Sequence, residues 1–245
     1  MPKSSAGVLR FHRYVDSLAT NAANPEMAHY PGLRSVPWRD PATVPLVADL
    51  EAAFTQVAAE LRALDDSSFH DEPESIGRSG TWDLVPLYEL SRKHPEICRR
   101  CPVTTAIVEH HANVPTLAGV CYLSRLAAHT EVLAHHGPTN LRSRCHLGID
   151  IPEGDCAIRV GDQVHSWQSG RCLVFDDYCE HEVWNRTDQD RTVLVVDVWH
   201  PDLDGVERAL LTGLHRYVAA NAEHLVQYWA GPDKGRTEAR YPGRT

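Results

Sequence analysis

Two histidines, each inside a dense cluster of polar residues, carry the residue types best suited to chemistry in this chain. His135 opens the segment HHGPTNLRSRCHLGIDIP, His181 lies within FDDYCEHEVWN, and Arg191 follows soon after. Neutral imidazole is the commonest metal ligand in proteins, and arginine grips carboxylates through a two-pronged fork. Two imidazoles brought together from separate strands, beside a guanidinium, would suit a divalent iron site that also holds an anionic co-substrate. An oxygen-activating enzyme needs such a site.

The segment LRSRCHLGIDI predicts a strand that carries two arginines and a histidine on one face. Alternate side chains of a strand share a face, so Arg142, Arg144 and His146 would point the same way. Two guanidiniums and an imidazole side by side repel one another unless an anion lies among them, and a dicarboxylate is a natural occupant. The alternative is a solvated edge face that pairs with the many acidic residues of the chain.

Four acidic residues flank His181, and any of them could fix the tautomer of a metal-binding imidazole. They are Asp176, Asp177, Glu180 and Glu182. A single histidine is more often structural than a ligand, so the metal hypothesis depends on the histidines and arginines taken together.

Other constellations are weaker. Cys98 and Cys101 are spaced like half of a zinc site, but the sequence has no second CxxC, which argues against zinc and favours reduced thiols. The run Glu109-His110-His111 could bind a metal, but it lies on an expected helix with only local support. No GxSxG, P-loop or GxGxxG motif occurs, which argues against the common hydrolase, nucleotide and dinucleotide chemistries.

Composition narrows the class of protein. A chain of 245 residues, 42% of them hydrophobic, can bury a full core as one domain. The net charge of −9 argues against nucleic-acid binding, and no apolar run approaches the ~20 residues that span a membrane. The N-terminus lacks the apolar stretch of a signal peptide, and seven cysteines without framework spacing favour reduced thiols in the cytoplasm. Arginine far outnumbers lysine, which hints at a bacterial source.

The expected elements are helical at first and β-type later. Residues 1–45, punctuated by Pro and Gly, predict an extended arm, and apolar residues at helical spacing predict one helix within PLVADLEAAFTQVAAELRALDD. Residues 65–80 predict a polar loop. From Trp82 onward, short β-type segments predict a sandwich or barrel, interrupted by a short helix near 101–111.

Turns and the C-terminal region complete this outline. Gly161-Asp162 lies between two alternating runs and predicts a hairpin turn. Residues 205–230 predict one helix or two.

The segments HHGPTNLRSRCHLGIDIP and VFDDYCEHEVWN…RTVLVVDVWHPDL closely resemble the catalytic domain of the aspartyl/asparaginyl β-hydroxylase family. This family consists of iron- and 2-oxoglutarate-dependent oxygenases built on a double-stranded β-helix. The resemblance runs from about Trp82 to Leu203, with GPTN, HLG, FDD, EHEVW and VDVWHP in order. It implies a mainly β fold with a jelly-roll (cupin-like) core and helices at both ends.

The resemblance also divides the chain, which we expect to form a single oxygenase domain over 1–245. Residues 1–81 would form an N-terminal arm and helical cover. Residues 82–203 would form the β-helix catalytic core, and 204–245 a C-terminal helix and tail.

The resemblance implies a role for each candidate site residue. His135 and His181 would bind Fe(II). Arg191, with Ser124, would hold the distal carboxylate of 2-oxoglutarate. The remaining pair, Arg144 and His146, would contact the end of the co-substrate that chelates iron.

Gly137 marks a departure from the wider oxygenase superfamily. Most of those relatives carry an acidic ligand two residues after the first histidine. The resembled family is known to lack it, so water would fill that iron position, with Asp177 as its hydrogen-bond partner. The neighbouring His136 could compete for metal or line the mouth of the site.

The implied reaction is hydroxylation of an unactivated C–H bond with molecular oxygen. The resemblance favours the β-carbon of an aspartyl- or asparaginyl-type unit as the position that is hydroxylated. The absence of a helical-repeat domain and of a membrane anchor favours a free amino acid, a carrier-bound aminoacyl group, a peptide or a small natural product over the animal substrates. Substrate-facing residues would come from the N-terminal arm and from loops such as 65–80 and 112–118, with Arg142 and His136 as candidates.

Two other classes remain open. A non-catalytic cupin-like module could bind a small acid or a metal without turnover. A zinc-type hydrolase or isomerase on the same barrel would need more ligands and a general base.

Overall fold

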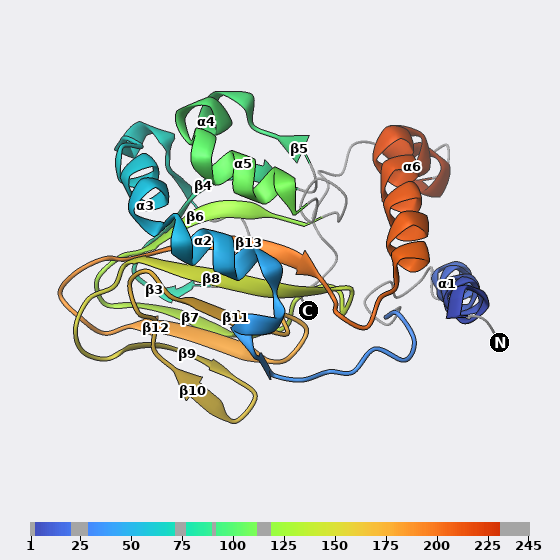
Figure 1. Ribbon diagram of the computed structural model, residues 1–245, viewed down its shortest axis with the longest axis horizontal. Coiled ribbons are helices and arrows are strands. Elements are labelled where there is room, and N and C mark those ends of the chain that lie inside the picture. The colour runs from blue at the N-terminus through green and yellow to red at the C-terminus, as the bar shows by residue number, and fades with distance from the viewer. Residues whose placement is uncertain (1–2, 21–28, 72–76, 90–91, 112–118, 231–245) are drawn as a thin grey trace.

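The computed structural model describes residues 3–20, 29–71, 77–89, 92–111 and 119–230. Its core consists of two antiparallel β-sheets that lie face to face (Figure 1). The large sheet has the order β1 (Trp38–Arg39), β11 (Cys172–Phe175), β8 (Arg142–Asp150), β13 (Arg191–Trp199), β6 (Cys121–Leu126), β4 (Trp82–Glu89) and β2 (His70–Asp71), and β5 (Arg92–Lys93) pairs with β4. The small sheet has the order β10 (Gln163–His165), β9 (Cys156–Val160), β12 (His181–Asn185), β7 (Thr130–His135) and β3 (Gly77–Ser79).

Strands β6 to β13 form a double-stranded β-helix. Consecutive strands alternate between the two sheets, apart from the β9–β10 hairpin, and give the orders β11-β8-β13-β6 and β10-β9-β12-β7. The hairpin turns at Gly161, whose φ of 57° suits glycine, and pairs Val160 with Gln163 as expected. The predicted fold class, a mainly β jelly-roll with helices at both ends, is confirmed. The predicted division of the chain at residues 81 and 203 stays a prediction.

The alternation predicted for strand β8 is confirmed. Cys145, Leu147 and Ile149 belong to the apolar cluster under the helices, whereas Arg144 and His146 face the space between the sheets. One strand therefore serves the core with one face and lines a pocket with the other.

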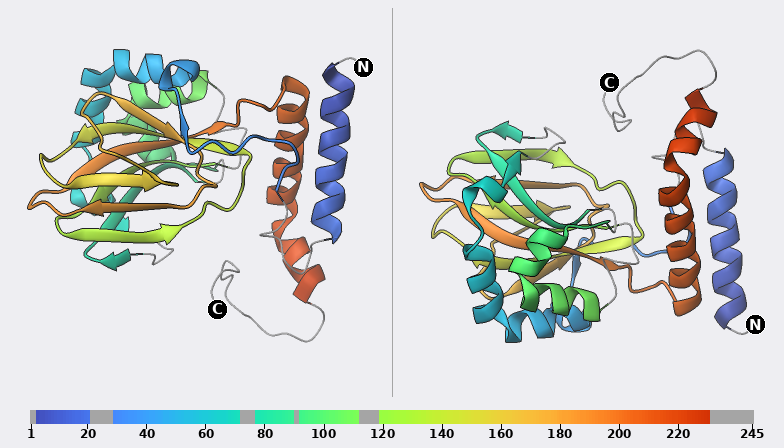
Figure 2. Two further views of the ribbon diagram at one scale, coloured as in Figure 1. Left: turned by 90° about the horizontal axis from the view of Figure 1, so that it is seen from below. Right: turned by 90° about the horizontal axis from the view of Figure 1, so that it is seen from above.

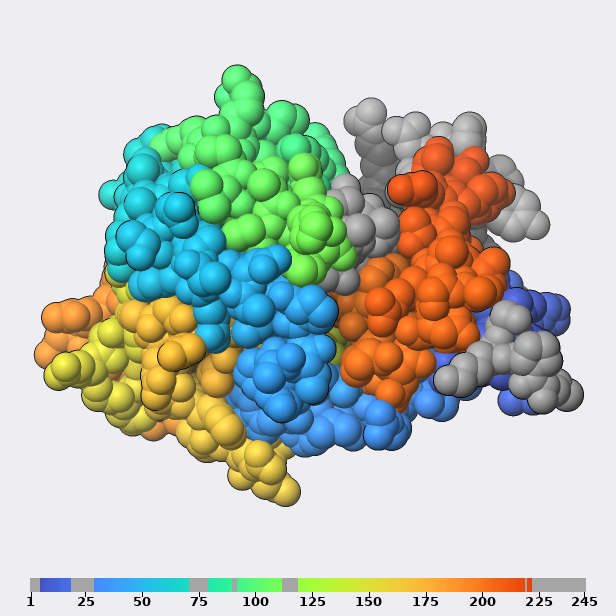
Figure 3. Space-filling model, viewed as in Figure 1, coloured from blue at the N-terminus to red at the C-terminus, as the bar shows by residue number. Residues whose placement is uncertain are grey.

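Helices α2 (Pro45–Ala52), α3 (Phe54–Arg62), α4 (Pro95–Arg100) and α5 (Pro102–His110) cover the outer face of the large sheet (Figures 1 and 3). The prediction of a single helix within PLVADLEAAFTQVAAELRALDD is wrong. The segment forms α2 and α3, which are separated at Ala53, whose φ of −94° and ψ of 11° leave the helical region. The break lets Leu50 of α2 and Val57 of α3 both reach the core.

Helices α1 (Lys3–Thr20) and α6 (Gly205–Ala230) lie side by side at one edge of the β-core (Figure 2). The extended arm predicted over 1–45 is wrong for α1, because Tyr14 of this helix packs into an apolar cluster with Leu211 of α6. Residues 29–39 do run as an extended arm that ends in β1. The C-terminal helix is confirmed, and in the described chain no helix is both long and apolar enough to cross a membrane.

Two smaller expectations have mixed outcomes. The loop predicted over 65–80 holds the short strands β2 and β3 and the 3-10 turn Asp66–Ser68, while 72–76 and 112–118 lie outside the described residues.

All seven cysteines are free thiols, Cys98 and Cys101 among them, as predicted.

A buried carboxylate, Glu207, joins α1, the arm and α6. Its side chain is 0% exposed and accepts hydrogen bonds from Arg10 Nε at 2.7 Å and Tyr30 Oη at 2.8 Å. It also accepts from the backbone of Asp204, whose side chain bonds the Glu207 amide in return, which is a capping box at the start of α6.

We predict that Glu207→Ala lowers the free energy of unfolding by about 3–5 kcal/mol, because it removes the buried acceptor of hydrogen bonds from Arg10, Tyr30 and the Asp204 amide. Denaturant titration of the variant checks this. Glu96→Ala is the control, since Glu96 is 81% exposed in its pair with Arg99 and should cost at most about 1 kcal/mol. Equal effects of the two substitutions would contradict this account of Glu207.

Candidate active site

The structure brings His135 and His181 together. His135 ends β7, His181 begins β12, and the two are direct partners in the sheet register with ring centroids 4.1 Å apart. In each ring Nδ1 lies within hydrogen-bond distance of a backbone carbonyl: 2.7 Å from Leu133 O for His135 and 2.9 Å from Cys179 O for His181. Because a carbonyl only accepts, Nδ1 is the donor in each ring. In the neutral form of the ring, Nε2 then keeps its lone pair, as metal binding requires.

Burial keeps His181 neutral. The ring is 3% exposed, and desolvation lowers the pKa of His181 to about 4, against the smaller opposing effect of Asp177. The imidazole is therefore uncharged at neutral pH, with its single proton on Nδ1.

We expected one of the four acidic residues around His181 to bond its imidazole and fix the tautomer, but none of them does so. Backbone carbonyls, not carboxylates, hold the two imidazoles. Glu180 and Glu182 pair with Arg159 on the outside, and Asp176 lies 3.6 Å from Arg39. Only Asp177 faces the pair, with Oδ1 3.8 Å from His181 Nε2.

Gly137 is a glycine because Asp177 occupies the space of its missing side chain. A Cβ at residue 137 would lie 2.0 Å from Asp177 Oδ2, and the Gly137 amide donates to the Asp177 carbonyl at 2.7 Å. The carboxylate beside the histidines thus comes from the turn before β12 instead of from position 137. An acidic side chain at position 137 would collide with Asp177, so the site can hold only one of the two carboxylates.

Asp177 belongs to a closed group of four buried charges, called here the Arg–Asp quartet: Arg142, Arg144, Asp177 and Asp197. Arg142 lies 3.3 Å from Asp177 and 3.0 Å from Asp197, and Arg144 lies 2.6 Å and 2.9 Å from the same two carboxylates. Both carboxylates are 0% exposed. Burial would raise the pKa of Asp177, but the charges of Arg144 and Arg142 outweigh it and hold that pKa well below its usual range.

The quartet corrects two expectations. The anions between Arg142 and Arg144 are the carboxylates of the chain itself, so no dicarboxylate ligand is needed to separate them. The solvated edge face is also wrong, because Arg142 is 6% exposed. Asp197 was missed, although a lone acid in the apolar run VLVVDVW is a signal, since a buried charge requires a partner.

A pocket between the sheets connects the histidine pair to Arg191. It is lined by Trp82, Tyr122, Ser124, Val132, His135, Arg144, His146, Ile158, Phe175, His181, Val183, Arg191 and Val195. Every predicted co-substrate residue thus lies on this pocket together with both histidines. Asp177 lies behind it, and His136 is exposed, its Nδ1 3.0 Å from the Tyr178 carbonyl.

Arg191 is a buried cation with no carboxylate partner in the described part of the chain. It is 3% exposed, and Nη1 donates to Ser124 Oγ at 3.3 Å while Nε has no hydrogen-bond partner. The guanidinium lies over the ring of Trp167, 4.8 Å from its centroid. Burial lowers the pKa of Arg191 to about 10, so it stays charged at neutral pH.

Ser124 and His146 present further donors. Ser124 Oγ already accepts from Arg191 and, at 2.9 Å, from Trp82 Nε1, which leaves its own hydrogen to donate. His146 Nδ1 accepts from Trp167 Nε1 at 3.3 Å. Burial lowers the pKa of His146 well below its usual value, so the ring is neutral and its proton is on Nε2. The pocket therefore offers an anion the positive charge of Arg191, the hydroxyl donor of Ser124 and the imidazole donor of His146.

Comparison with known proteins decides the family. The family model for aspartyl/asparaginyl beta-hydroxylase matches residues 51–201. The chain belongs to this family. The resemblance stated from the sequence is thereby confirmed.

The chain is also similar to individual proteins. The chain is 34% identical over 190 residues to the aspartyl/asparaginyl beta-hydroxylase of Mus musculus, covering 75% of this chain and 26% of that protein. It is 35% identical over 182 residues to the ornithine lipid ester-linked acyl 2-hydroxylase of Rhizobium tropici, covering 70% and 63%. It thus spans about a quarter of the mouse relative and under two thirds of the bacterial one. An oxidoreductase of the 2OG-Fe(II) oxygenase family from Burkholderia pseudomallei has a TM-score of 0.43 and 13% identity, over 68% of this chain and 94% of that one.

We predict that Gly137→Ala lowers the free energy of unfolding by about 1–3 kcal/mol, the usual cost of an overpacked site. It should also weaken metal binding, because Asp177 must move. Denaturant titration and a metal titration measure the two effects. The control is Gly205→Ala, where a Cβ meets nothing within 4 Å. A Gly137→Ala protein with the stability and metal affinity of the control would contradict the placement of Asp177.

Proposed function

We propose that this chain is an Fe(II)- and 2-oxoglutarate-dependent hydroxylase that replaces an unactivated C–H bond by C–OH. The observation that carries the proposal is Arg191, a buried cation in the same pocket as two inward-facing imidazoles. A buried charge without a partner costs several kcal/mol, and an anionic ligand would remove that cost. The quartet leaves no net charge of its own, so this attraction for an anion is centred on Arg191.

The donor set fits iron and 2-oxoglutarate. The Nε2 atoms of His135 and His181 would hold the metal. The Asp177 carboxylate, whose Oδ1 lies 3.8 Å from His181 Nε2, would accept a hydrogen bond from a water on the metal. Arg191 and Ser124 would bind the distal carboxylate of the co-substrate. At its other end, Arg144 and the Nε2–H of His146 would contact the oxygens that face the metal.

Bound iron, with 2-oxoglutarate and oxygen, supplies the oxidising power that a C–H bond requires, and side chains alone do not. The residues of the chain orient the reactants and keep water out. Trp82, Phe175 and Val195 line the pocket with apolar surface, which strengthens the ionic contact at Arg191 by lowering the local dielectric constant. The quartet holds Arg144 and Asp177 in place, because each of their charged groups has two partners.

For the substrate, we propose the β-carbon of an aspartyl- or asparaginyl-type unit, in a free amino acid, a carrier-bound aminoacyl group, a peptide or a small natural product. The names of the family and of the mouse relative support an aspartyl or asparaginyl unit. The name of the Rhizobium tropici relative adds a lipid acyl chain hydroxylated at position 2 to the compounds worth testing. Cytoplasmic localisation and a bacterial source stay predictions.

The first test is succinate formation by the wild type and by His135→Ala and His181→Ala. We predict a loss of more than about 100-fold in each variant, beyond the about 10- to 100-fold typical of residues that only support metal ligands. His12→Ala, which replaces a histidine 73% exposed on α1, should retain full activity. Succinate formation in either active-site variant at the level of His12→Ala would rule out the two-histidine iron site.

The second test concerns the co-substrate anchor. We predict that Arg191→Ala raises KM for 2-oxoglutarate about 10- to 100-fold, since a hydrogen bond to a charged group contributes about 1.5–3 kcal/mol. Stability should not fall, because the substitution removes an unpaired buried charge. Arg159→Ala, which removes an outward-facing ion pair, is the control and should leave KM unchanged. An unchanged KM in Arg191→Ala would place the carboxylate anchor elsewhere.

A further inference from the structure

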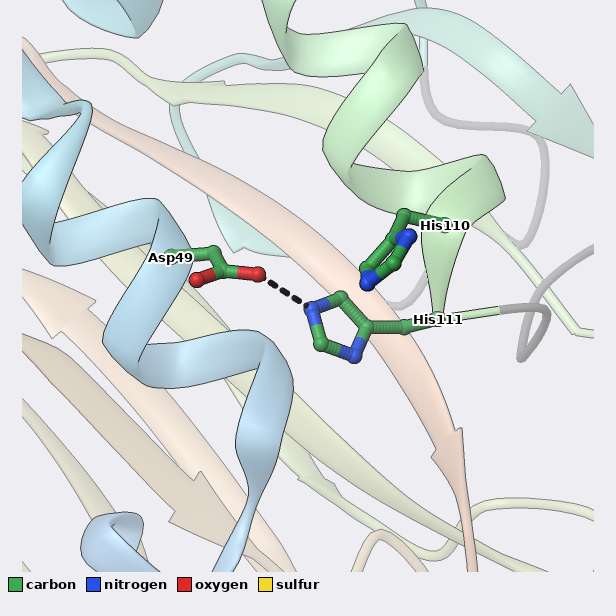
Figure 4. Close-up of side chains that lie close together, drawn as sticks. All are labelled: Asp49, His110 and His111. Atoms are coloured by element: carbon green, nitrogen blue, oxygen red, sulfur yellow. Dashed lines mark hydrogen bonds and ion pairs between the residues drawn. The ribbon is translucent and has the colours of Figure 1, made fainter.

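A second group of metal-ligating side chains lies outside the active site, on the helical cover of the large sheet. Asp49 comes from α2, His110 is the last residue of α5, and His111 follows it. One ligand atom from each lies within 4.8 Å of the other two (Figure 4). Among the described residues, this is the one group of three or more His, Cys, Asp or Glu side chains that meets this spacing.

The sequence suggested Glu109, His110 and His111 as a possible set of metal ligands, and the structure replaces one member of that set. Glu109 turns away to Lys93 and Tyr88, and Asp49 takes its place from a different helix. A site that joins two helices constrains its ligands more than a run on a single helix does.

The three side chains are partly arranged for a cation. His111 Nε2 lies 2.8 Å from Asp49 Oδ2, and the His111 side chain is 13% exposed. The ring of His110 is turned toward this pair, with its centroid 5.1 Å from that of His111 (Figure 4). Asp49 forms no ion pair with a lysine or arginine in the described chain, so its charge is not otherwise neutralised. The negative end of the α5 dipole adds to the attraction for a cation.

We propose that Asp49, His110 and His111 bind a divalent transition metal of the Zn²⁺ type and so link α2 to α5. Imidazole nitrogen and carboxylate oxygen are ligands that zinc prefers, at about 2.0–2.2 Å, which places neighbouring ligands of a tetrahedral site about 3.3–3.6 Å apart. The His111–Asp49 contact has to open slightly, and the exposed His110 has to close by a rotamer adjustment. Water takes the fourth position, because His110 and Asp49 are exposed.

The expected consequence is stability, since the metal joins two helices that cover the same apolar cluster through Leu50 and Val108. Ligand binding to the folded state alone raises the apparent stability by mass action. The site lies apart from the pocket between the sheets, so this inference does not depend on the proposed hydroxylase activity.

Titration of metal-free protein with Zn²⁺ in a calorimeter tests the inference. The variant His135→Ala/His181→Ala removes the active-site imidazoles and should still bind one equivalent of Zn²⁺. Adding His110→Ala should abolish that equivalent together with the Zn²⁺-dependent rise in Tm. Asp49→Asn should weaken it at least about tenfold, or 1.4 kcal/mol.

A matched control and a second route keep the test decisive. Asp188 lies 2.9 Å from His129 in an exposed pair with no second histidine near it, so Asp188→Asn should change nothing. If the double alanine variant does not fold, His110→Ala in the wild-type chain should lower the Zn²⁺ stoichiometry by one. Three results would each overturn the proposal: zinc binding that survives His110→Ala in the double variant, a Zn²⁺ stoichiometry that His110→Ala leaves unchanged in the wild-type chain, and no zinc binding by a folded double variant.

Discussion

The pairing of buried charges is the constraint on which this site depends. The Arg–Asp quartet places two guanidiniums and two carboxylates in the interior, where each charge would cost several kcal/mol if it were alone. The closed arrangement gives every member two partners of opposite sign. It fixes the Asp177 carboxylate beside the histidine pair, and it fixes Arg144 on the wall of the pocket. Arg191 is the exception, a buried charge that the described chain leaves without a carboxylate.

The double-stranded β-helix explains how residues distant in sequence meet. Strands β7 and β12 are neighbours in the small sheet, so the end of one and the start of the other bring His135 opposite His181. Strand β8 lies in the facing sheet and turns Arg144 and His146 toward them. Each imidazole is therefore placed by backbone register, and the carbonyls that hold the imidazoles come from the same strands or adjoining turns.

The sequence allowed the fold and much of the site to be predicted, because strand periodicity and distinctive motifs are local signals. The two faces of β8, the hairpin at Gly161 and the location of His135 and His181 on one site were accessible in this way. The quartet was not, since its pairs join β8 to β13 and to the turn before β12. Only the lone acid Asp197 in an apolar strand could have indicated it. Likewise the break at Ala53 and the packing of α1 on α6 depend on tertiary contacts that helical periodicity does not specify.

We propose that one pocket holds iron through two histidines and 2-oxoglutarate through Arg191. Anaerobic titration of the metal-free protein with Fe(II) and 2-oxoglutarate tests it most directly, because a chelate of both gives a visible metal-to-ligand charge-transfer band. We expect the band to appear, to saturate at one equivalent of iron, and to disappear with succinate formation once oxygen is admitted. A folded protein that binds iron but develops no band would contradict the claim and favour a binding module or a zinc enzyme on the same barrel.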